Sequence, residues 1–361
     1  MYFYIPTKIY QQDGCVRAHG QELAALGSRA LIVTGKHSSR KNGSLSDVVS
    51  ALEAHGIPFL IFDDIEENPS VETVIKAKEA GLSFGADFVI GIGGGSPMDA
   101  SKSIALLMKH PEKPADFLYA RGDGDSLPVA AVPTTCGTGS EATPWSILTR
   151  HELKIKQGIA RPVFPSLALC DPGYLAFAPH SVLVSTAIDA FSHCVESYIN
   201  ANATPYSRML CLQSLRLWGE AKGALAGNRA PSPQDLSNLM CASTLAGMAI
   251  SHTSTSLPHG LSYYLTYDDS IPHGLAVGVF QVPYLAAAGS QAAAPLLTAA
   301  GFADLGALAA FLTPLTKQDI PQATRERAIR GMMGNESKLK NCPFAVSEKL
   351  LEGFFGENET L

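Results

Sequence analysis

The sequence predicts a Rossmann-like α/β domain in the N-terminal half and an all-α domain in the C-terminal half. Strand-like and helix-like segments alternate along the first half, and glycine-rich turns follow two of the strands. After Asp171-Pro172-Gly173 this alternation stops, and long segments rich in Ala, Leu and Ser follow. Strands that alternate with helices imply a parallel sheet covered on both faces. We therefore expect two domains, residues 1–178 and 179–361.

The elements of the first half are assigned from short apolar runs and from helical spacing of apolar residues. Strands are expected over residues 29–35, 58–65, 87–94, 128–135, 145–149 and 167–171. Helices are expected between them, over residues 44–56, 70–80 and 96–110. From about residue 181 the chain is expected to be helical, with a last helix around residues 347–355.

Composition excludes several classes of protein. An apolar fraction of 46% with 17% charged residues is typical of a chain with a large core. The net charge of −6 is spread along the chain, which argues against nucleic acid as a partner. Neither an apolar run of roughly 18 residues nor a secretory signal is present, so no membrane partner is expected. The seven scattered cysteines form no CxxC pair, which favours reduced thiols and a cytoplasmic location.

The first glycine-rich turn, residues 91–97, joins the third strand to a helix. Glycines let a phosphate approach the backbone closely, and the N–H groups at a helix start attract an anion. Ser96 is expected at the N-cap, Pro97 at the first helical position and Asp99 as a reciprocal cap. The pattern is not GxGxxG, so a tight structural turn is the alternative interpretation.

A second loop strengthens the case for a bound dinucleotide. Residues 133–141 place hydroxyls and glycines directly after a strand, where they can bind phosphate, ribose or amide groups. Two such loops at strand ends point to a ligand in the crevice of an α/β sheet, whereas an ordinary Ser/Thr-rich turn is the alternative. After the first strand comes Gly35-Lys36-His37-Ser38-Ser39-Arg40-Lys41, without a carboxylate for ribose hydroxyls. We therefore expect NADP(H) to be preferred over NAD(H).

A metal site is predicted in the second half. Asp189 and His193 are spaced i, i+4 in a helical segment, so both side chains project from one face, and His259 and His273 are each followed by Gly-Leu. One carboxylate and three imidazoles suit either Fe(II) or Zn(II), and the residues alone do not separate the two metals. A surface or capping pair is the alternative for Asp189 and His193. The other nearby histidines, His180 and His252, are expected to be hydrogen-bonded core residues.

These motifs together resemble the iron-containing (group III) alcohol dehydrogenases, which are related in fold to glycerol dehydrogenase and dehydroquinate synthase. The matching segments are GGGSPMDASKSIA at 93–105, PTTCGTGSEATPWSIL at 133–148, STAIDAFSHCVESY at 185–198, SLPHGLSYYL at 256–265 and IPHGLAVGV at 271–279. They occur in the family's order across most of the chain. The resemblance implies the dehydroquinate synthase-like fold, a homodimer and no aldehyde-dehydrogenase partner domain.

The resemblance also implies roles for individual residues. The residues implied as metal ligands are Asp189, His193, His259 and His273. The residues implied at the dinucleotide are Gly94, Gly95 and Ser96 at the pyrophosphate, Thr134, Thr135 and Thr138 on the nicotinamide side, Asn68 and Lys156 elsewhere, and Gly35, Ser38 and Ser39 as in NADP-preferring members. Asp99, in the same turn as Ser96, is also expected among the cofactor-binding residues. Many members carry a further His four residues after the third ligand. Tyr263 occupies that position here and becomes the candidate for proton transfer.

The expected function is that of a metal-dependent, NAD(P)-linked alcohol dehydrogenase or aldehyde reductase acting on a small alcohol or aldehyde. A glycerol dehydrogenase-like enzyme, a dehydroquinate synthase-like enzyme and a catalytically silent nucleotide-binding protein are the alternatives. The sequence offers Trp145, Leu257, Tyr263 and Tyr264 as candidates for the substrate pocket.

Overall fold

The computed structural model describes residues 2–356, and within them the chain forms two compact units. Tyr4–Pro179 form the first unit. The described residues from His180 onward, together with Tyr2 and Phe3, form the second. The domain boundary predicted after residue 178 lies next to this division.

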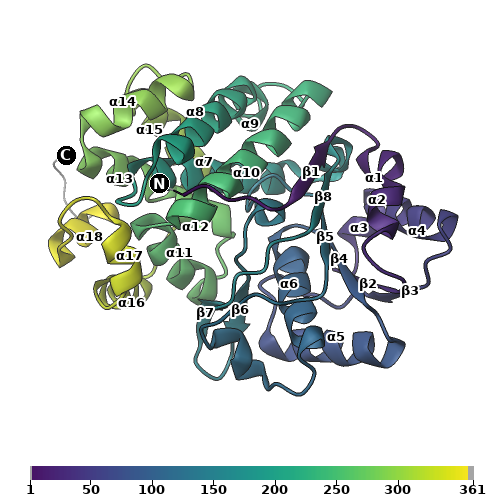
Figure 1. Ribbon diagram of the computed structural model, residues 1–361. Coiled ribbons are helices and arrows are strands. Elements are labelled where there is room, and N and C mark those ends of the chain that lie inside the picture. The colour runs from purple at the N-terminus through teal and green to yellow at the C-terminus, as the bar shows by residue number, and fades with distance from the viewer. Residues whose placement is uncertain (1, 357–361) are drawn as a thin grey trace. The chain divides into compact units, whose positions relative to one another are not determined.

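The first unit is built on a six-stranded parallel sheet with the strand order β1-β8-β5-β4-β2-β3 (Figure 1). All neighbouring strands in it run parallel. The four strands inside the sheet are buried along their whole length. The strands are β1 Lys8–Gln11, β2 Ala30–Thr34, β3 Phe59–Phe62, β4 Phe88–Gly93, β5 Val129–Pro133 and β8 Leu167–Cys170.

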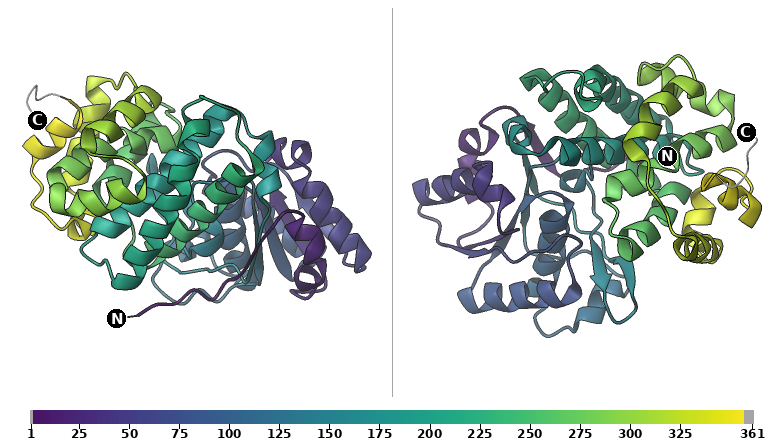
Figure 2. Two further views of the ribbon diagram at one scale, coloured as in Figure 1. Left: turned by 90° about the horizontal axis from the view of Figure 1, so that it is seen from above. Right: turned by 180° about the vertical axis from the view of Figure 1, so that it is seen from behind.

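Helices cover both faces of this sheet, as a parallel sheet requires (Figure 1 and Figure 2). Alternate residues of β2 and β4 face opposite sides, so that Ile32 and Ile90 join one core cluster and Leu31 and Val89 the other. The first cluster includes residues of α1 Cys15–Ala18, α2 Gly20–Ala24 and α4 Ser44–Ala54, and the second includes residues of α5 Val71–Phe84 and α6 Gly95–Lys109. The α/β architecture predicted from the sequence is therefore confirmed.

Two features of the first unit differ from the prediction. The segment expected as a strand over 145–149 does not join the parallel sheet, because β6 Ile147–Arg150 pairs antiparallel with β7 Ile155–Gly158 in a separate ribbon. The edge strand β1 was not predicted, because its four residues are exposed or only half-buried and show no buried run. The short helix α3 Ser38–Lys41 and the 3-10 turns Ala115–Tyr119, Ser140–Ala142 and Pro172–Phe177 complete the unit.

Among its described residues, the second unit contains helices joined by loops and no strand. Its helices are α7 His180–Ile199, α8 Pro205–Glu220, α9 Lys222–Leu225, α10 Pro233–Thr253, α11 Leu257–Asp268, α12 His273–Gly278, α13 Gln281–Ala288, α14 Ser290–Ala299, α15 Leu305–Thr316, α16 Gln322–Met333, α17 Glu336–Asn341 and α18 Glu348–Phe354. Capping boxes at Thr204 and Ser232, each followed by proline, start α8 and α10. Among the described residues, no helix combines the length and the hydropathy that a membrane span needs.

The core of the second unit forms around α7, which contacts α8, α10 and α12. Trp218 of α8 is buried against Phe191 of α7, and its indole N–H donates to the carbonyl oxygen of Ala187 at 2.8 Å. An aromatic residue with its polar atom satisfied is a strong anchor for a helix pair. This packing fixes α7, the helix that carries Asp189 and His193.

Candidate functional site

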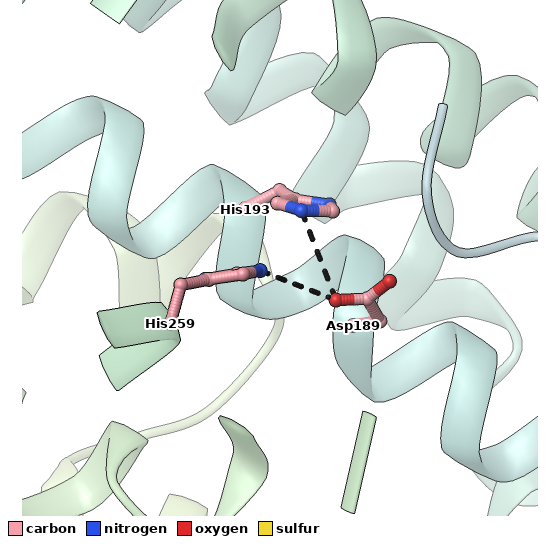
Figure 3. A group of neighbouring side chains, drawn as sticks. All are labelled: Asp189, His193 and His259. Atoms are coloured by element: carbon pink, nitrogen blue, oxygen red, sulfur yellow. Dashed lines mark ion pairs between the residues drawn. The ribbon is translucent and has the colours of Figure 1, made fainter. Parts of the chain in front are cut away.

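Four side chains of the second unit meet around one carboxylate oxygen. Asp189 and His193 lie one turn apart on α7, His259 lies in the first turn of α11, and His273 is the first residue of α12. The Nε2 atoms of His193, His259 and His273 lie 3.7, 3.3 and 3.7 Å from Asp189 Oδ1. Figure 3 shows the imidazoles of His193 and His259 directed at the Asp189 carboxylate.

The glycine after each of the last two histidines has a packing reason. A Cβ on Gly274 would lie 1.7 Å from the carbonyl oxygen of Ser185, so only glycine lets α12 lie against α7 at this point. A Cβ on Gly260 would lie 2.7 Å from the sulfur of Met332. Gly274 therefore lets α12 begin close enough to α7 for the His273 imidazole to reach Asp189, whereas Gly260 lets α11 pack against Met332 of α16.

The donor set fits a divalent transition metal. Asp189 Oδ1 and His259 Nε2 are buried, and the contact between them lacks the geometry of a hydrogen bond. Ligand atoms of Asp189, His193 and His259 all lie within 4.8 Å of one another. Burial raises the pKa of the Asp189 carboxyl, but the surrounding imidazoles outweigh burial and hold it well below its usual range. One ionised carboxylate and several imidazoles converging in the interior is the ligand set that Fe(II) and Zn(II) prefer.

The sequence prediction missed Glu196, which is fully buried on α7. Its Oε1 accepts a hydrogen bond from Nδ1 of His259, and its Oε2 accepts from the Ser256 N–H at 2.7 Å. Burial lowers the pKa of the His259 imidazole, but the Glu196 and Asp189 carboxylates outweigh it and raise that pKa to about 9. Glu196 follows Asp189 and His193 at i+7 and i+3, so helical periodicity alone could have placed it on the same face.

The two other histidines differ from the prediction in their burial. His180 Nε2 donates a hydrogen bond to the Ala224 carbonyl at 2.9 Å, but its side chain is exposed and it is not a core residue. His252 is half-buried, bonds the Met248 carbonyl at 2.8 Å and stacks on Phe3. Both lie at the surface of the second unit because they occur near helix ends rather than in the middle of an apolar face.

In the first unit, the two predicted dinucleotide loops lie against each other. The Thr134 N–H donates to the Gly93 carbonyl at 2.8 Å, which joins the ends of β4 and β5. A Cβ on Gly94 would lie 3.1 Å from Oγ1 of Thr135, and a Cβ on Gly95 would lie 2.6 Å from Cγ2 of Thr138. The threonine loop therefore packs closely on Gly94 and Gly95, at the start of α6.

The predicted cap of α6 is wrong. The helix begins at Gly95 with Gly94 as its N-cap, so Ser96 and Pro97 are its second and third residues, and no side chain caps it. Asp99 instead accepts hydrogen bonds from Ser140 Oγ at 2.5 Å and the Ile147 N–H at 2.8 Å. Lys102, fully buried, lies 3.6 Å from the same carboxylate. Both Asp99 oxygens thus hold the 140–147 segment, and its predicted role at the dinucleotide stays a prediction.

Three other predicted residues converge at one point of the first unit. The Asn68 N–H donates to Ser96 Oγ at 3.2 Å, and Lys156 Nζ donates to Asn68 Oδ1. Asn68 adopts a left-handed backbone conformation with a φ of 58°, and its carbonyl accepts from Thr149 Oγ1 at 2.9 Å. The α5 side of the sheet, the start of α6 and the β6–β7 ribbon are therefore tied together at Asn68.

The segment after β2 shows carboxylates that the sequence did not reveal. Lys36 Nζ lies 2.9 Å from Asp64, and Arg40 Nη2 lies 2.7 Å from Asp63, both residues that follow β3. Of the predicted residues, Gly35 follows β2, Ser38 is exposed at the start of α3, and Ser39 is fully buried with its hydroxyl accepting from Thr34. Parallel pairing of β2 with β3 brings these acidic side chains to the end of β2.

The remaining candidates of the second unit lie on α11. The Tyr263 ring stacks on His273 with a centroid separation of 5.9 Å, and Lys338 Nζ lies 5.6 Å from the same ring. Leu257 is fully buried, whereas Tyr264 lies beside Arg327. Trp145, in the first unit, is 38% exposed. Tyr263 is thus the aromatic candidate in contact with a predicted ligand.

Comparisons with known proteins agree with this geometry. Residues 6–172 match the model of the iron-containing alcohol dehydrogenases, and residues 183–319 match the model of the C-terminal part of the Fe-containing alcohol dehydrogenase family. The crystal structure of an iron-containing alcohol dehydrogenase from Thermotoga maritima superposes with a TM-score of 0.90 at 34% identity, covering 99% of this chain and 98% of that one.

Two characterised relatives are similar over most of their length. Sulfoacetaldehyde reductase of Bilophila wadsworthia is 32% identical over 286 residues, which are 78% of this chain and 73% of that protein. NADPH-dependent butanol dehydrogenase of Clostridium saccharobutylicum is 29% identical over 294 residues, which are 79% of this chain and 73% of that protein.

Proposed function

The chain belongs to the iron-containing alcohol dehydrogenase family and is an NAD(P)-linked enzyme for alcohols or aldehydes, and we propose that Asp189, His193, His259 and His273 hold its metal. The observation that carries this proposal is the approach of three imidazole nitrogens to one buried carboxylate oxygen. Iron(II) is the proposed resident metal, with zinc(II) as the alternative, because both accept this mixture of ligands.

A divalent metal in such a site supplies Lewis acidity, which stabilises an alkoxide or polarises a carbonyl group. The chain's own residues determine where that chemistry acts. Asp189 gives the site its negative charge, and the exposed fraction of 27% on the His273 side chain marks the open side of the cluster. The ring of Tyr263 lies along that open side against His273, and we propose that its hydroxyl exchanges the proton of the substrate.

For the dinucleotide, we propose that the backbone of Gly94, Gly95 and Ser96 binds the pyrophosphate. The start of α6 offers N–H groups without a side-chain cap, and a helix start of this kind favours a bound anion. Thr134, Thr135 and Thr138 come from the loop packed on these glycines, whereas Asn68 donates to Ser96 and in turn accepts from Lys156. Hydride transfer is the chemistry of the nicotinamide that this site would hold.

A preference for NADP(H) over NAD(H) is part of the proposal. Lys36 and Arg40 are cations at the end of β2 that can bind a 2′-phosphate, and Ser38 adds an exposed hydroxyl. Asp63 and Asp64 pair with these cations and therefore weaken the field that a phosphate would meet. The NADPH dependence named for the relative from Clostridium saccharobutylicum supports the preference.

We further propose a cytoplasmic homodimer acting on a small alcohol or aldehyde. Exposed apolar side chains near the N-terminus, with Phe3 against Tyr206 and Met209 61% exposed on α8, support an interface between two copies. The seven cysteines, all among the described residues, form no disulfide and six of them are buried, which supports a reducing compartment. Light scattering after size exclusion measures the oligomeric state, and a monomeric mass would contradict the dimer.

The decisive experiment combines metal analysis with turnover. Protein purified without oxygen is expected to contain about one iron per chain and to oxidise NADPH in the presence of short aldehydes. A dehydroquinate synthase-like activity consumes no dinucleotide in net terms, so sustained NADPH oxidation excludes it. Absence of turnover across a broad panel of alcohols and aldehydes, with metal present, would contradict the proposal and favour a silent binding protein.

A further inference from the structure

The carboxylate of Glu196 contacts His259 on two sides. Its Oε1 accepts from the imidazole Nδ1, whereas its Oε2 accepts from the backbone N–H groups of Ser256 at 2.7 Å and His259 at 3.4 Å. Ser256 is the N-cap residue of α11, yet its own side chain makes no capping hydrogen bond. The Glu196 carboxylate of α7 therefore caps the start of α11, where a negative charge is favoured.

The turn before α11 is held from a distant part of the sequence. Ser254 adopts a φ of 61°, which is unfavourable for any residue with a Cβ, so this turn needs outside support. Helix α17 supplies it, because Lys338 Nζ donates to Thr255 Oγ1 and Asn341 Nδ2 donates to the Thr255 carbonyl at 2.8 Å. Helix α17 lies beyond residue 319, where the match to the family model ends.

Lys338 is also the cation nearest this contact in the chain of hydrogen bonds, because its Nζ donates to Thr255 and the N–H of the next residue, Ser256, donates to Glu196. Burial lowers the pKa of the Lys338 ammonium to about 8, and the attraction of Glu196 opposes that fall. Burial raises the pKa of the Glu196 carboxyl, but His259 and Lys338 together outweigh burial and lower it. A buried carboxylate without such partners would be strongly destabilising, so the two charges depend on each other.

We propose that Glu196, with Lys338 as its cation, is a positioning residue for the metal site. By occupying Nδ1 it fixes the tautomer and the ring plane of His259, so that Nε2 is the atom presented beside Asp189. By capping α11 it also fixes the backbone from which that ring projects. The inference rests on the proposed ligation by His259, and it makes helix α17 part of the metal site.

The test is the zinc(II) affinity of metal-free protein, measured by competition with a chromophoric chelator. Glu196→Gln keeps the size of the side chain but replaces one acceptor oxygen with an NH₂ group, which cannot accept from the N–H groups around it. We expect zinc affinity to fall about 10- to 100-fold, the usual effect of removing a partner of a metal-bound histidine.

Two matched variants separate this role from general destabilisation and from failure of the ligation itself. Asp235→Asn also removes a buried carboxylate that caps a helix and pairs with a cation, but on α10. It should lower the melting temperature and leave zinc affinity unchanged. His259→Ala should abolish tight zinc binding. Retention of zinc by His259→Ala would overturn the ligation, whereas parent-like affinity in Glu196→Gln alone would overturn only the positioning role.

Lys338 offers a second, independent arm that also decides the matter if Glu196→Gln yields no folded protein. Lys338→Met keeps the length of the side chain without its charge, and Lys338→Arg keeps the charge. We expect Lys338→Met to bind zinc about tenfold more weakly than the parent and Lys338→Arg to restore most of the difference. Equal affinities in Lys338→Met and the parent protein would contradict the proposal.

Discussion

The proposed metal site and the proposed dinucleotide site are built in different ways. Around Asp189, charged and imidazole side chains come from three helices, α7, α11 and α12, and their placement depends on contacts between residues far apart in sequence, such as Glu196 with His259. Around Gly94 and Gly95, two short loops at strand ends supply backbone groups and small side chains. The first site is held by buried charges, and the second by the close approach of chain segments.

This difference predicts how each site should fail. Buried charges depend on one another, so a lost partner in the helical unit should disturb the whole cluster. A loop that depends on glycines is disturbed when a side chain is added to one of them, because even a methyl group can displace the backbone N–H groups. Substitutions in one unit should therefore leave the binding property of the other unit unaffected.

The largest effect is expected for His259→Ala. Removal of a ligand from the cluster should lower kcat/KM by about 10³-fold or more, because a metal contributes several kcal/mol to stabilisation of developing charge. NADPH binding, measured by fluorescence titration, should stay within about twofold of the parent value, since that site belongs to the other unit. Loss of NADPH affinity in step with activity would break the separation.

The converse change is Gly95→Ala in the first unit. Its new Cβ would lie 2.6 Å from Cγ2 of Thr138, so the loop or the helix start must move. We expect kcat/KM for the dinucleotide to fall on the order of 10²-fold while the metal content stays at the parent level. Gly223→Ala, which meets only Arg229 at 3.6 Å, is the control and should change neither. Normal kinetics in Gly95→Ala would place the dinucleotide elsewhere.

Tyr263→Phe tests the candidate for proton transfer. Loss of the hydroxyl should lower kcat by about 10²-fold, at the lower end of general acid–base contributions, with metal content unchanged. Tyr267→Phe, one turn further along α11 and beside Arg327, is the control and should retain full kcat. A Tyr263→Phe enzyme as fast as the parent would limit Tyr263 to packing against His273.

Arg40→Ala sharpens the choice of coenzyme. If Arg40 binds the 2′-phosphate, its loss should raise KM for NADPH about tenfold, as expected for one charge-assisted hydrogen bond, without affecting NADH. Asp63→Asn removes the competing carboxylate and should lower KM for NADPH by about twofold, the scale of an exposed ion pair. A parent enzyme that prefers NADH in kcat/KM would contradict the assignment.

The smallest effect, on stability alone, is expected for Asp235→Asn. Arg229 beside Asp235 holds the pKa of that carboxyl below its ordinary value, and Ser232 and its N–H add to this. A lowered pKa in the folded state means that the contribution is present above about pH 4 and is lost as the pH falls. Denaturation with urea should show a loss of about 1–2 kcal/mol at pH 7 that shrinks below pH 4. A difference independent of pH would rule out the charge as its origin.

Much of the first unit could be predicted because its signals are local. A buried parallel strand is a continuous apolar run, as in Ala30–Thr34, and a glycine loop ends it. Strand β1 lacks such a run because it lies at the sheet edge, and the antiparallel pairing of β6 with β7 depends on the turn at Lys154, where φ is 53°. Pairing partners are a property of three-dimensional packing that apolar periodicity does not specify.

The candidate sites divide along the same line. The four metal ligands could be predicted because each lies in a motif that the sequence shows directly. The helical period also places Asp189 and His193 on one face of α7. The role of Lys338 could not be predicted, because no sequence pattern around it indicates that α17 contacts the turn before α11. Asp63 and Asp64 were missed beside Lys36 and Arg40 for a related reason, because parallel strands bring together residues separated by a whole helix.

The position of β1 has a consequence for the order of folding. Strand β1, the first strand of this sheet in chain order, pairs only with β8, the last strand of the sheet, at register Lys8 to Leu167. On the ribosome this N-terminal segment must therefore wait, without a partner, until nearly the whole first unit has emerged. Because β1 is short and its side chains are exposed or half-buried, it has little tendency to pair with another nascent chain before β8 is available, whereas a longer apolar edge strand would do so readily.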